Sequence, residues 1–200
     1  MKISAVLLAA GLSQRMNRDK LLLEYNGKSL LRTAMDLLSG LPVYERIIVT
    51  SDDRAKYILN EGIPADIRLL VNNNPERGLN GSIIAGVKTA TGTHYLFLPA
   101  DQPKLTLNDL TQILKAADLN RDKIIYPLID SKPCSPTIFP ERFKEDLLKL
   151  PDDPLSSNAD SGARIIRDSN KMNCMEVLPE CPENFTDIDI EEDYNELVYS

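Results

Sequence analysis

The stretch that decides the fold is residues 3–22, ISAVLLAAGLSQRMNRDKLL. Residues 3–8 form a short, mostly apolar run that is typical of a strand buried in a parallel sheet. A loop of small residues follows, and it carries Arg15, Arg18 and Lys20. Small residues let backbone N–H groups approach an anion, while arginine offers phosphate a planar fork and lysine a point charge. We therefore expect a phosphate-binding loop after a buried strand, with a surface loop of solvated cations as the alternative.

The rest of the chain repeats this alternation of apolar runs and helical patterns. Strands are predicted over residues 3–8, 46–50, 67–71, 95–98, 123–128, 137–139 and 175–178. Helices are predicted over residues 30–38, 53–60, 79–89, 108–117, 140–150 and 161–168, and from about Glu191. Such alternation implies βαβ units, so we expect an α/β fold with helices on both faces of a mostly parallel sheet.

The length of 200 residues suits one domain, residues 1–200. The stretch 130–162 is richer in Pro, Ser and Asp than the rest, which makes it a candidate lid or acceptor-facing insertion. The net charge of −7 argues against a nucleic-acid or anionic-membrane surface, because phosphate backbones demand a broad basic face.

The cysteine pattern also narrows the function class. Cys134, Cys174 and Cys181 contain no CxxC pair and the chain has one histidine, whereas a structural zinc site needs about four such ligands. Sparse, odd-numbered cysteines favour a reducing compartment, so we expect a cytoplasmic protein. No run approaches the ~18 apolar residues of a membrane span, and the first apolar run is too short for a signal peptide.

Asp101 follows the fourth predicted strand, in LPADQP at residues 98–103. Ligands of open parallel sheets bind beyond the carboxyl ends of the strands, which is also where the first loop lies. Magnesium in such sites typically takes one or two carboxylates plus substrate phosphates. Asp101 is therefore a candidate metal ligand, and a turn aspartate that bonds its own backbone is the equally good alternative.

A second pair of carboxylates lies in TDIDIEEDY, residues 186–194. Asp187 and Asp189 fall on one face if the segment is extended, so one of them can supply a further metal ligand. The alternative is that Asp189 caps a helix whose first turn carries Glu191 and Glu192.

The segment NNNPERGLNGSIIAG, residues 72–86, places a turn-rich loop before a helix. Ser82 and backbone donors near that helix start can meet a nucleotide base or ribose. A turn and a helix cap form the alternative interpretation, and the two are compatible.

Together these segments resemble the MobA-like nucleotidyltransferases, in particular the molybdenum cofactor cytidylyltransferase branch. The family's first motif, approximately LAAGxSxRMGxxKLL, is LAAGLSQRMNRDKLL here, residues 8–22. Its DxP motif matches DQP at 101–103, and its closing DxDTPED is echoed by DIDIEED at 187–193. Gly78 and Ser82 echo its Gly/Ser motif, and GAR at 162–164 matches its late Gly-Ala-Arg.

The sequence departs from the family pattern at a few positions. Asn17 and Asn80 stand where glycine is usual, and asparagine is the residue that best tolerates a left-handed backbone. Ser135 stands where histidine is frequent. Arg18 matches no fixed position of the family, so we expect it to be a solvated side chain.

The resemblance implies a three-layer α/β/α fold with a Rossmann-like, mostly parallel sheet of the nucleotide-diphospho-sugar transferase type. It implies Mg²⁺-dependent transfer of a nucleoside monophosphate from an NTP to the terminal phosphate of molybdopterin, with release of pyrophosphate. Alanine at position 10 goes with cytidine nucleotides in the family, which favours CTP over GTP.

The resemblance also implies roles for individual residues. Arg15, Lys20 and Asp101 are the expected catalytic residues. Magnesium is expected on Asp101 and Asp189, with Asp187 as the alternative second ligand. The nucleotide is expected to contact Leu8, Ala9, Ala10, Gly11, Ser13, Arg15, Lys20, Gly78, Ser82 and Asp101.

Two other functions remain open at this point. One is a sugar- or alcohol-phosphate nucleotidyltransferase on the same fold; Asp19 before Lys20 disfavours the isoprenoid-pathway type, where a proline usually precedes the lysine. The other is a nucleotide-binding or cofactor-delivery protein without turnover, acting as a partner of a molybdenum hydroxylase or its chaperone.

Replacement of Arg15 tests the assignment of the first loop. Arg15→Ala should weaken triphosphate binding severely, because the guanidinium supplies charge-assisted hydrogen bonds to phosphate. The measurement is the dissociation constant of the NTP for the variant and the unaltered protein. An unchanged affinity would remove Arg15 from the site.

Overall fold

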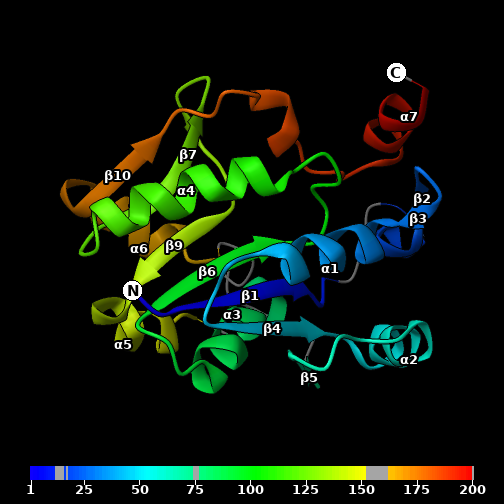
Figure 1. Ribbon diagram of the computed structural model, residues 1–200, viewed down its shortest axis with the longest axis horizontal. Coiled ribbons are helices and arrows are strands. Elements are labelled where there is room, and N and C mark those ends of the chain that lie inside the picture. Colours follow the sequence, from blue (N-terminus) through cyan, green and yellow to red (C-terminus); the bar gives the residue numbers. More distant parts are fainter. Residues whose placement is uncertain (12–15, 17, 74–76, 152–161, 200) are drawn as a thin grey trace.

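The computed structural model is a layered α/β protein with a twisted central sheet (Figure 1). It describes residues 1–11, 16, 18–73, 77–151 and 162–199. Ser13 and Arg15 of the first loop, and Asn17, lie outside these described residues, as do residues 152–161 of the predicted insertion.

The elements follow one another in regular alternation. The strands are β1 (Ile3–Ala9), β2 (Glu24–Tyr25), β3 (Lys28–Ser29), β4 (Glu45–Thr50), β5 (Ile67–Val71), β6 (His94–Pro99), β7 (Ile124–Ile129), β8 (Lys132–Pro133), β9 (Thr137–Pro140) and β10 (Cys174–Val177). The α-helices are α1 (Leu30–Gly40), α2 (Asp52–Glu61), α3 (Gly78–Thr89), α4 (Leu107–Leu119), α5 (Lys144–Leu148), α6 (Arg164–Ser169) and α7 (Glu191–Tyr199). Short 3₁₀ helices include η1 (Lys20–Leu22), η3 (Glu141–Phe143) and η5 (Pro182–Phe185).

Local sequence signals fix where the helices begin. The hydroxyl of Ser29 accepts a hydrogen bond from the N–H of Arg32 at 3.0 Å and caps α1. Thr106 and Asp109 form a reciprocal capping box at the start of α4. These caps satisfy N–H groups that have no partner inside the helix.

The main sheet contains eight strands among the described residues, in the order β10-β7-β9-β6-β1-β4-β5, with β8 paired to β7. β1 runs parallel to both β4 and β6, with Leu7 opposite Ile48 on one side and Leu98 on the other. β9 is antiparallel to β6 and to β7. A small separate hairpin joins β2 and β3.

Alternate residues of β1 face two separate apolar cores. Ala5 and Leu7 join the core beneath α1, α2 and α4, whereas Val6 joins the core beneath α3, α5 and α6. This alternation is the pattern of a strand covered on both faces. The predicted three-layer α/β/α arrangement is therefore confirmed.

The parallel strands bring four chain segments to one edge of the sheet. β1, β4, β5 and β6 are parallel neighbours, so the segments that follow them lie at the same edge. Gly11, Ser51, Asn72 and Asp101 each come within a few residues after a strand end. β1 lies between β4 and β6, which is the switch in strand order where ligands of such sheets bind.

The structure adds detail to the sequence-based predictions. The stretch predicted as a helix over residues 140–150 is η3 followed by the short helix α5. Residues 137–140, within the candidate insertion 130–162, form β9 in the middle of the sheet. In the part of the chain that is described, no helix is both long enough and apolar enough to span a membrane.

The contact between α3 and β1 leaves no space for a side chain at Gly86. A Cβ added there would lie 2.6 Å from Cγ1 of the buried Val6. Gly86→Ala should therefore lower the free energy of unfolding by about 1–3 kcal/mol, despite the better helix propensity of alanine. Denaturant unfolding measures the loss. The Gly86→Ala, Val6→Ala double variant is the control, because the smaller side chain at position 6 relieves the clash. Its loss of unfolding free energy should be smaller than the sum of the losses in the two single variants. A loss equal to that sum would contradict the predicted clash.

Candidate active site

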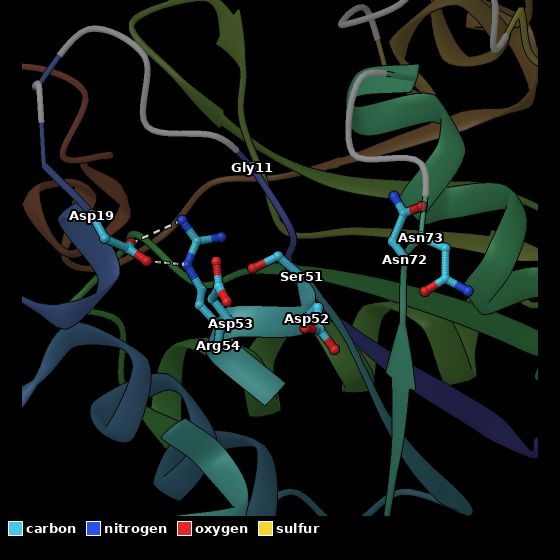
Figure 2. Close-up of a pocket in the computed structure, with 8 residues that line it drawn as sticks. All are labelled: Gly11, Asp19, Ser51, Asp52, Asp53, Arg54, Asn72 and Asn73. Carbon is cyan, nitrogen blue, oxygen red and sulfur yellow. Dashed lines mark hydrogen bonds and ion pairs between the residues drawn. The ribbon is translucent and has the colours of Figure 1, made fainter. Parts of the chain in front are cut away.

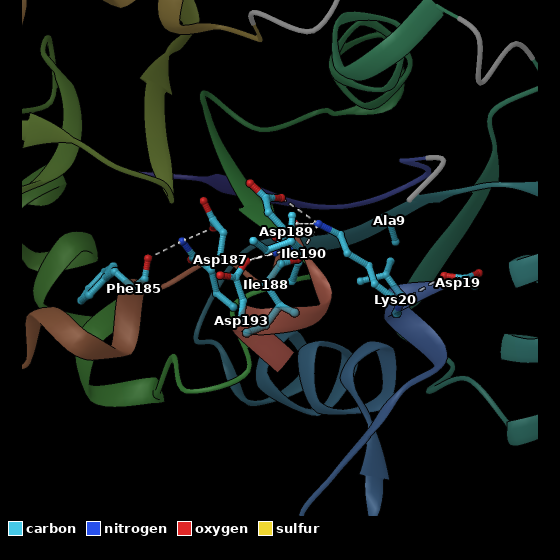
Figure 3. A network of polar contacts seen from close by, with 12 residues as sticks. Ala9, Asp19, Lys20, Phe185, Asp187, Ile188, Asp189, Ile190 and Asp193 are labelled. Carbon is cyan, nitrogen blue, oxygen red and sulfur yellow. Dashed lines mark hydrogen bonds and ion pairs between the residues drawn. The ribbon is translucent and has the colours of Figure 1, made fainter. Parts of the chain in front are cut away.

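Lys20 lies at the centre of a polar cluster at the carboxyl edge of the sheet. Its Nζ donates hydrogen bonds to Oδ2 of Asp101 at 2.7 Å, to the carbonyl of Ile188 at 2.7 Å and to Oδ1 of Asp189 at 3.1 Å. Only 14% of the Lys20 side chain is exposed. Figure 3 shows Lys20 reaching from η1 toward Asp189 and Ile188. The ammonium thus joins segments from the beginning, middle and end of the chain.

The turn after β6 holds the C-terminal segment in place. The carbonyl of Asp101 accepts a hydrogen bond from the N–H of Ile188 at 2.9 Å. The side-chain amide of the buried Gln102 donates to the carbonyl of Phe185 at 3.1 Å and to Oδ1 of Asp187 at 2.9 Å. These bonds explain why a distant segment places its carboxylates next to Asp101.

The charges of the cluster change the proton affinity of its members. Burial alone would lower the pKa of Lys20, but the carboxylates of Asp101 and Asp189 outweigh it and raise that pKa. Desolvation, followed by the negative charge of Asp101 and Asp189, raises the pKa of Asp187 to about 7, although Gln102 and Lys20 act in the opposite direction. The cluster therefore favours the charged form of the Lys20 ammonium and leaves the Asp187 carboxyl partly protonated near neutral pH.

The oxygens around Lys20 form the donor set that a hard divalent cation prefers. Asp101 and Asp189 both direct an oxygen at one cationic group, the lysine Nζ, so they converge on a single position. In the described residues, no group of three or more His, Cys, Asp or Glu side chains is close enough to hold a metal by itself. A two-carboxylate site completed by substrate oxygens is the usual form for Mg²⁺, so the residues fit that ion.

A cavity of about 440 Å³ opens at the carboxyl ends of β4 and β5, and Asp19, the neighbour of Lys20 in sequence, lies in its wall (Figure 2). It is lined by Gly11, Asp19, residues 51–54 after β4, and Asn72 and Asn73 after β5. The volume lies in the range of small-molecule pockets, roughly 300–1,000 Å³. Its walls carry carboxylates, amides and a hydroxyl, which together provide hydrogen-bond donors and acceptors for a polar ligand.

One wall of the cavity is an ion pair between Asp19 and Arg54. Nε and Nη2 of Arg54 donate to the two oxygens of the Asp19 carboxylate at 2.6 and 2.8 Å. Nη1 donates to the carbonyl of Ala9 at 2.7 Å. The side chain of Arg54 is only 5% exposed. This bidentate geometry is the strong form of an arginine–carboxylate contact.

The structure brings most of the predicted site residues to the same edge, in two groups. Lys20, Asp101, Asp187 and Asp189 form the polar cluster, and Gly11 lies at the cavity. Leu8 and Ala9 are the last two residues of β1, and Ala10 follows them. Ser13 and Arg15 are the predicted residues that lie outside the described part of the chain.

Gly78 and Ser82 belong to the first turns of α3. Gly78 has a φ of +64°, a conformation that suits glycine, and it begins the helix. Ser82 is buried, and its hydroxyl accepts a hydrogen bond from the side chain of Asn72 at 3.2 Å. Because Asn72 lines the cavity, Ser82 supports the cavity wall from behind.

Asp189 lies just before α7 and is hydrogen-bonded through both its backbone and its side chain. Oδ2 of Asp193 accepts hydrogen bonds from the N–H groups of Asp189 and Ile190 at 2.7 and 2.9 Å, while Oδ1 of Asp189 accepts from Lys20. The side chain of Arg18 is 47% exposed, as expected of a solvated side chain. It also forms an ion pair with Glu191 and lies over the ring of Tyr194 at 5.5 Å, so it contacts α7.

Sequence reasoning missed the roles of Asp19, Arg54 and the Asp52–Asp53 pair at the cavity. Asp52 and Asp53 occupy the first turn of α2. The available signal was their position directly after β4, which places them at the ligand-binding edge.

Known proteins resemble this chain in sequence. Residues 5–172 match the MobA-like NTP transferase domain. A molybdenum cofactor guanylyltransferase of Pseudomonas fluorescens (strain Pf0-1) is 35% identical over 126 residues, which are 60% of this chain and 58% of that protein. The molybdenum cofactor cytidylyltransferase of Escherichia coli (strain K12) is 28% identical over 138 residues, 68% of this chain and 69% of that protein. The match thus covers less than two thirds of the Pseudomonas relative.

The fold is shared with solved structures as well. Rv0371c from Mycobacterium tuberculosis H37Rv superposes with a TM-score of 0.82 over 100% of this chain and 98% of its own, at 21% sequence identity. At this identity, the likeness establishes the fold of the nucleotide-diphospho-sugar transferase type.

The raised pKa of Asp187 makes the stability of the protein depend on pH. An unfolded aspartate has a pKa near 3.9, so the folded state binds more protons between about pH 4 and pH 7 and stability falls as pH rises through this window. Asp187→Asn removes this penalty. Without metal it should raise the melting temperature at pH 8, by about a few degrees because solvent screens the partly exposed residue, and leave it nearly unchanged at pH 4.

The exposed Asp122, in the turn between α4 and β7, provides the control. Asp122→Asn should leave the pH dependence of the melting temperature unchanged, as measured by calorimetry across pH 4–8. Parallel curves for Asp187→Asn and the unaltered protein would contradict the raised pKa.

Proposed function

Because the chain belongs to the MobA-like NTP transferase family, we propose that it is a Mg²⁺-dependent nucleotidyltransferase. It transfers a nucleoside monophosphate, CMP in preference to GMP, from the NTP to the terminal phosphate of molybdopterin or the molybdenum cofactor, and it releases pyrophosphate. The contact of Lys20 with Asp101 and Asp189 is the observation that carries this proposal.

Lys20 and the carboxylates provide the electrostatics that phosphoryl chemistry needs. Such reactions depend on positioning and charge neutralisation rather than on covalent help from the protein. When the NTP binds, the ammonium of Lys20 can leave its carboxylate partners and bind oxygens of the α-phosphate instead. Asp101 and Asp189 then hold Mg²⁺, which would neutralise charge on the phosphates when bound. Asp187 remains the alternative second ligand.

The cavity next to the cluster suits the nucleoside and the phosphates nearest to it. Its polar lining after β4 and β5 can bond the edge of a base. Ala9 and Ser82 contact the lining residues Arg54 and Asn72, and we expect them, with Ala10, to border the base or ribose. Backbone donors around Gly11, together with Arg15, hold the β- and γ-phosphates. This arrangement directs the α-phosphorus toward Lys20 and Asp101.

The chemical step requires no general base from the protein. An oxygen of the acceptor's terminal phosphate attacks the α-phosphorus, and the bond from that phosphorus to the oxygen bridging the β-phosphate breaks, so pyrophosphate leaves. A phosphate monoester has its second pKa near 6 and is largely a dianion at neutral pH. The absence of a nucleophilic triad among the motifs of the sequence agrees with this chemistry.

Two sequence features support the choice of nucleotide and acceptor. Ala10 occupies the motif position that goes with cytidine nucleotides in the family. The matched relatives from Pseudomonas and Escherichia coli are named for guanylyl and cytidylyl transfer, respectively, to the molybdenum cofactor. The acceptor is proposed as molybdopterin on that basis, and delivery of the product to a molybdenum hydroxylase or its chaperone would follow.

A substrate screen tests the proposed function directly. Pyrophosphate release is measured with CTP, GTP, ATP and UTP, each with Mg²⁺ and with or without molybdopterin. We expect release that requires molybdopterin and is fastest with CTP. Release that requires a sugar or alcohol phosphate instead would assign the other acceptor class, and binding of NTP without release under any condition would overturn the enzymatic proposal.

Replacement of Asp101 tests the metal assignment. Asp101→Ala should lower the rate of pyrophosphate release at least about 100-fold, because a lost metal ligand removes several kcal/mol of charge stabilisation. Asp118→Ala is the matched control, since that aspartate is exposed on α4 and pairs only with the nearby Arg121 among its described contacts. Circular dichroism checks that both variants are folded. Near-normal turnover of Asp101→Ala across a Mg²⁺ titration would remove this residue from the metal site.

A further inference from the structure

Arg54 makes contacts that the proposed chemistry does not use. It projects from the first turn of α2, and its guanidinium is buried at the cavity wall (Figure 2). Its donors are directed at the Asp19 carboxylate and the Ala9 carbonyl, at 2.6–2.8 Å. A buried guanidinium with partners of this quality is a fixed part of the structure rather than a mobile surface cation.

The two partners of Arg54 flank the first loop. Ala9 is the last residue of β1, and Asp19 immediately precedes η1. One guanidinium therefore binds the chain on both sides of the segment that contains Gly11.

The contact with Asp19 also orients Lys20. Oδ1 of Asp19 accepts a hydrogen bond from the N–H of Leu21 at 3.1 Å, and the Asp19 carbonyl accepts from the N–H of Leu22 at 3.1 Å. These bonds form the 3₁₀ turn in which Lys20 is the first residue. Arg54 thus holds the residue that shapes the turn from which Lys20 reaches Asp101.

The contact with Ala9 orients the backbone at the other end. The Ala9 carbonyl accepts from Nη1 of Arg54 at 2.7 Å and from the hydroxyl of Thr50 at 3.3 Å. A trans peptide directs its C=O and its N–H to opposite sides. Because the Ala9 carbonyl is directed toward α2, the N–H of Ala10 is directed away from α2. The partly negative carbonyl oxygen is then also directed away from the proposed phosphate site.

We propose that Arg54 is a positioning residue for nucleotidyl transfer: it clamps Ala9 and Asp19 and thereby sets Lys20 and the Ala10 N–H relative to each other. This inference rests on the proposed function. Lysine cannot replace arginine here, because a single ammonium cannot bond both carboxylate oxygens and a separate carbonyl in the fixed geometry of the planar fork.

Arg46 offers a matched control at the opposite end of β4. It too bridges backbone carbonyls, those of Leu38 and Leu41, and an aspartate, Asp66. Arg54→Lys and Arg46→Lys therefore remove the same kind of bonds, at the site and away from it. Both should lower the melting temperature, but only Arg54→Lys should lower kcat/KM for the NTP, by about 10–100-fold and mainly through kcat, because misplacement by about 1 Å has this effect on transfer.

Amide hydrogen exchange of the unligated protein provides a readout that does not depend on turnover. Arg54→Lys should speed the exchange of the Leu21, Leu22 and Leu23 amides, which are bonded within the η1 turn, and Arg46→Lys should not. Asp19→Asn retains the size of the side chain and should reproduce the effects of Arg54→Lys. It replaces Arg54→Lys as the test if that variant does not fold.

The outcomes separate this inference from the proposed function. Unchanged exchange at η1 in both site variants, or equal losses of kcat/KM in Arg54→Lys and Arg46→Lys, overturns the clamp. If the unaltered protein turns over no NTP in the substrate screen, the proposed function fails, and the exchange data still decide whether Arg54 sets the η1 turn.

Discussion

The contact of the Lys20 ammonium with Asp101, Asp189 and the Ile188 carbonyl is the constraint on which the arrangement of the site depends. Withdrawing a charge from water is costly, and here the cost is offset by partners from two other segments. Because those segments come from the turn after β6 and from the stretch before α7, the contact is possible only when the central sheet is complete. The site is therefore a consequence of the tertiary fold.

The same constraint explains the path of the C-terminal segment. Its apolar contribution is small, since Ile188 and Leu197 join Met16 and Leu30 in a cluster separate from the two main cores. Polar contacts supplement it: Arg18 pairs with Glu191, and the hydroxyl of Tyr194 donates to the Glu24 carbonyl at 2.7 Å. α7 lies next to the β2–β3 hairpin in Figure 1, and one ion pair and one neutral hydrogen bond help to hold it there.

The sequence was sufficient to predict the alternating elements and the edge where the site lies. β1, β4, β5 and β6 carry continuous apolar runs, and parallel pairing follows from the helices between them. The antiparallel orientation of β9 was not predictable, because a buried strand has the same apolar pattern in either direction. Lys20 and Asp101 were found from motif and strand position, whereas the bond between Asp19 and Arg54 joins residues distant in sequence and leaves no periodic signal.

Asp19 and Lys20 are adjacent in sequence but serve opposite halves of the site. At the start of η1, the Asp19 side chain turns toward Arg54 and the cavity, while Lys20 turns toward Asp101 and Asp189 (Figures 2 and 3). A nucleotide that fills the cavity and presents its phosphates to Lys20 would cross this dipeptide. The geometry of one short turn therefore sets the directions of both charges, Asp19 toward Arg54 and the cavity and Lys20 toward Asp101 and Asp189.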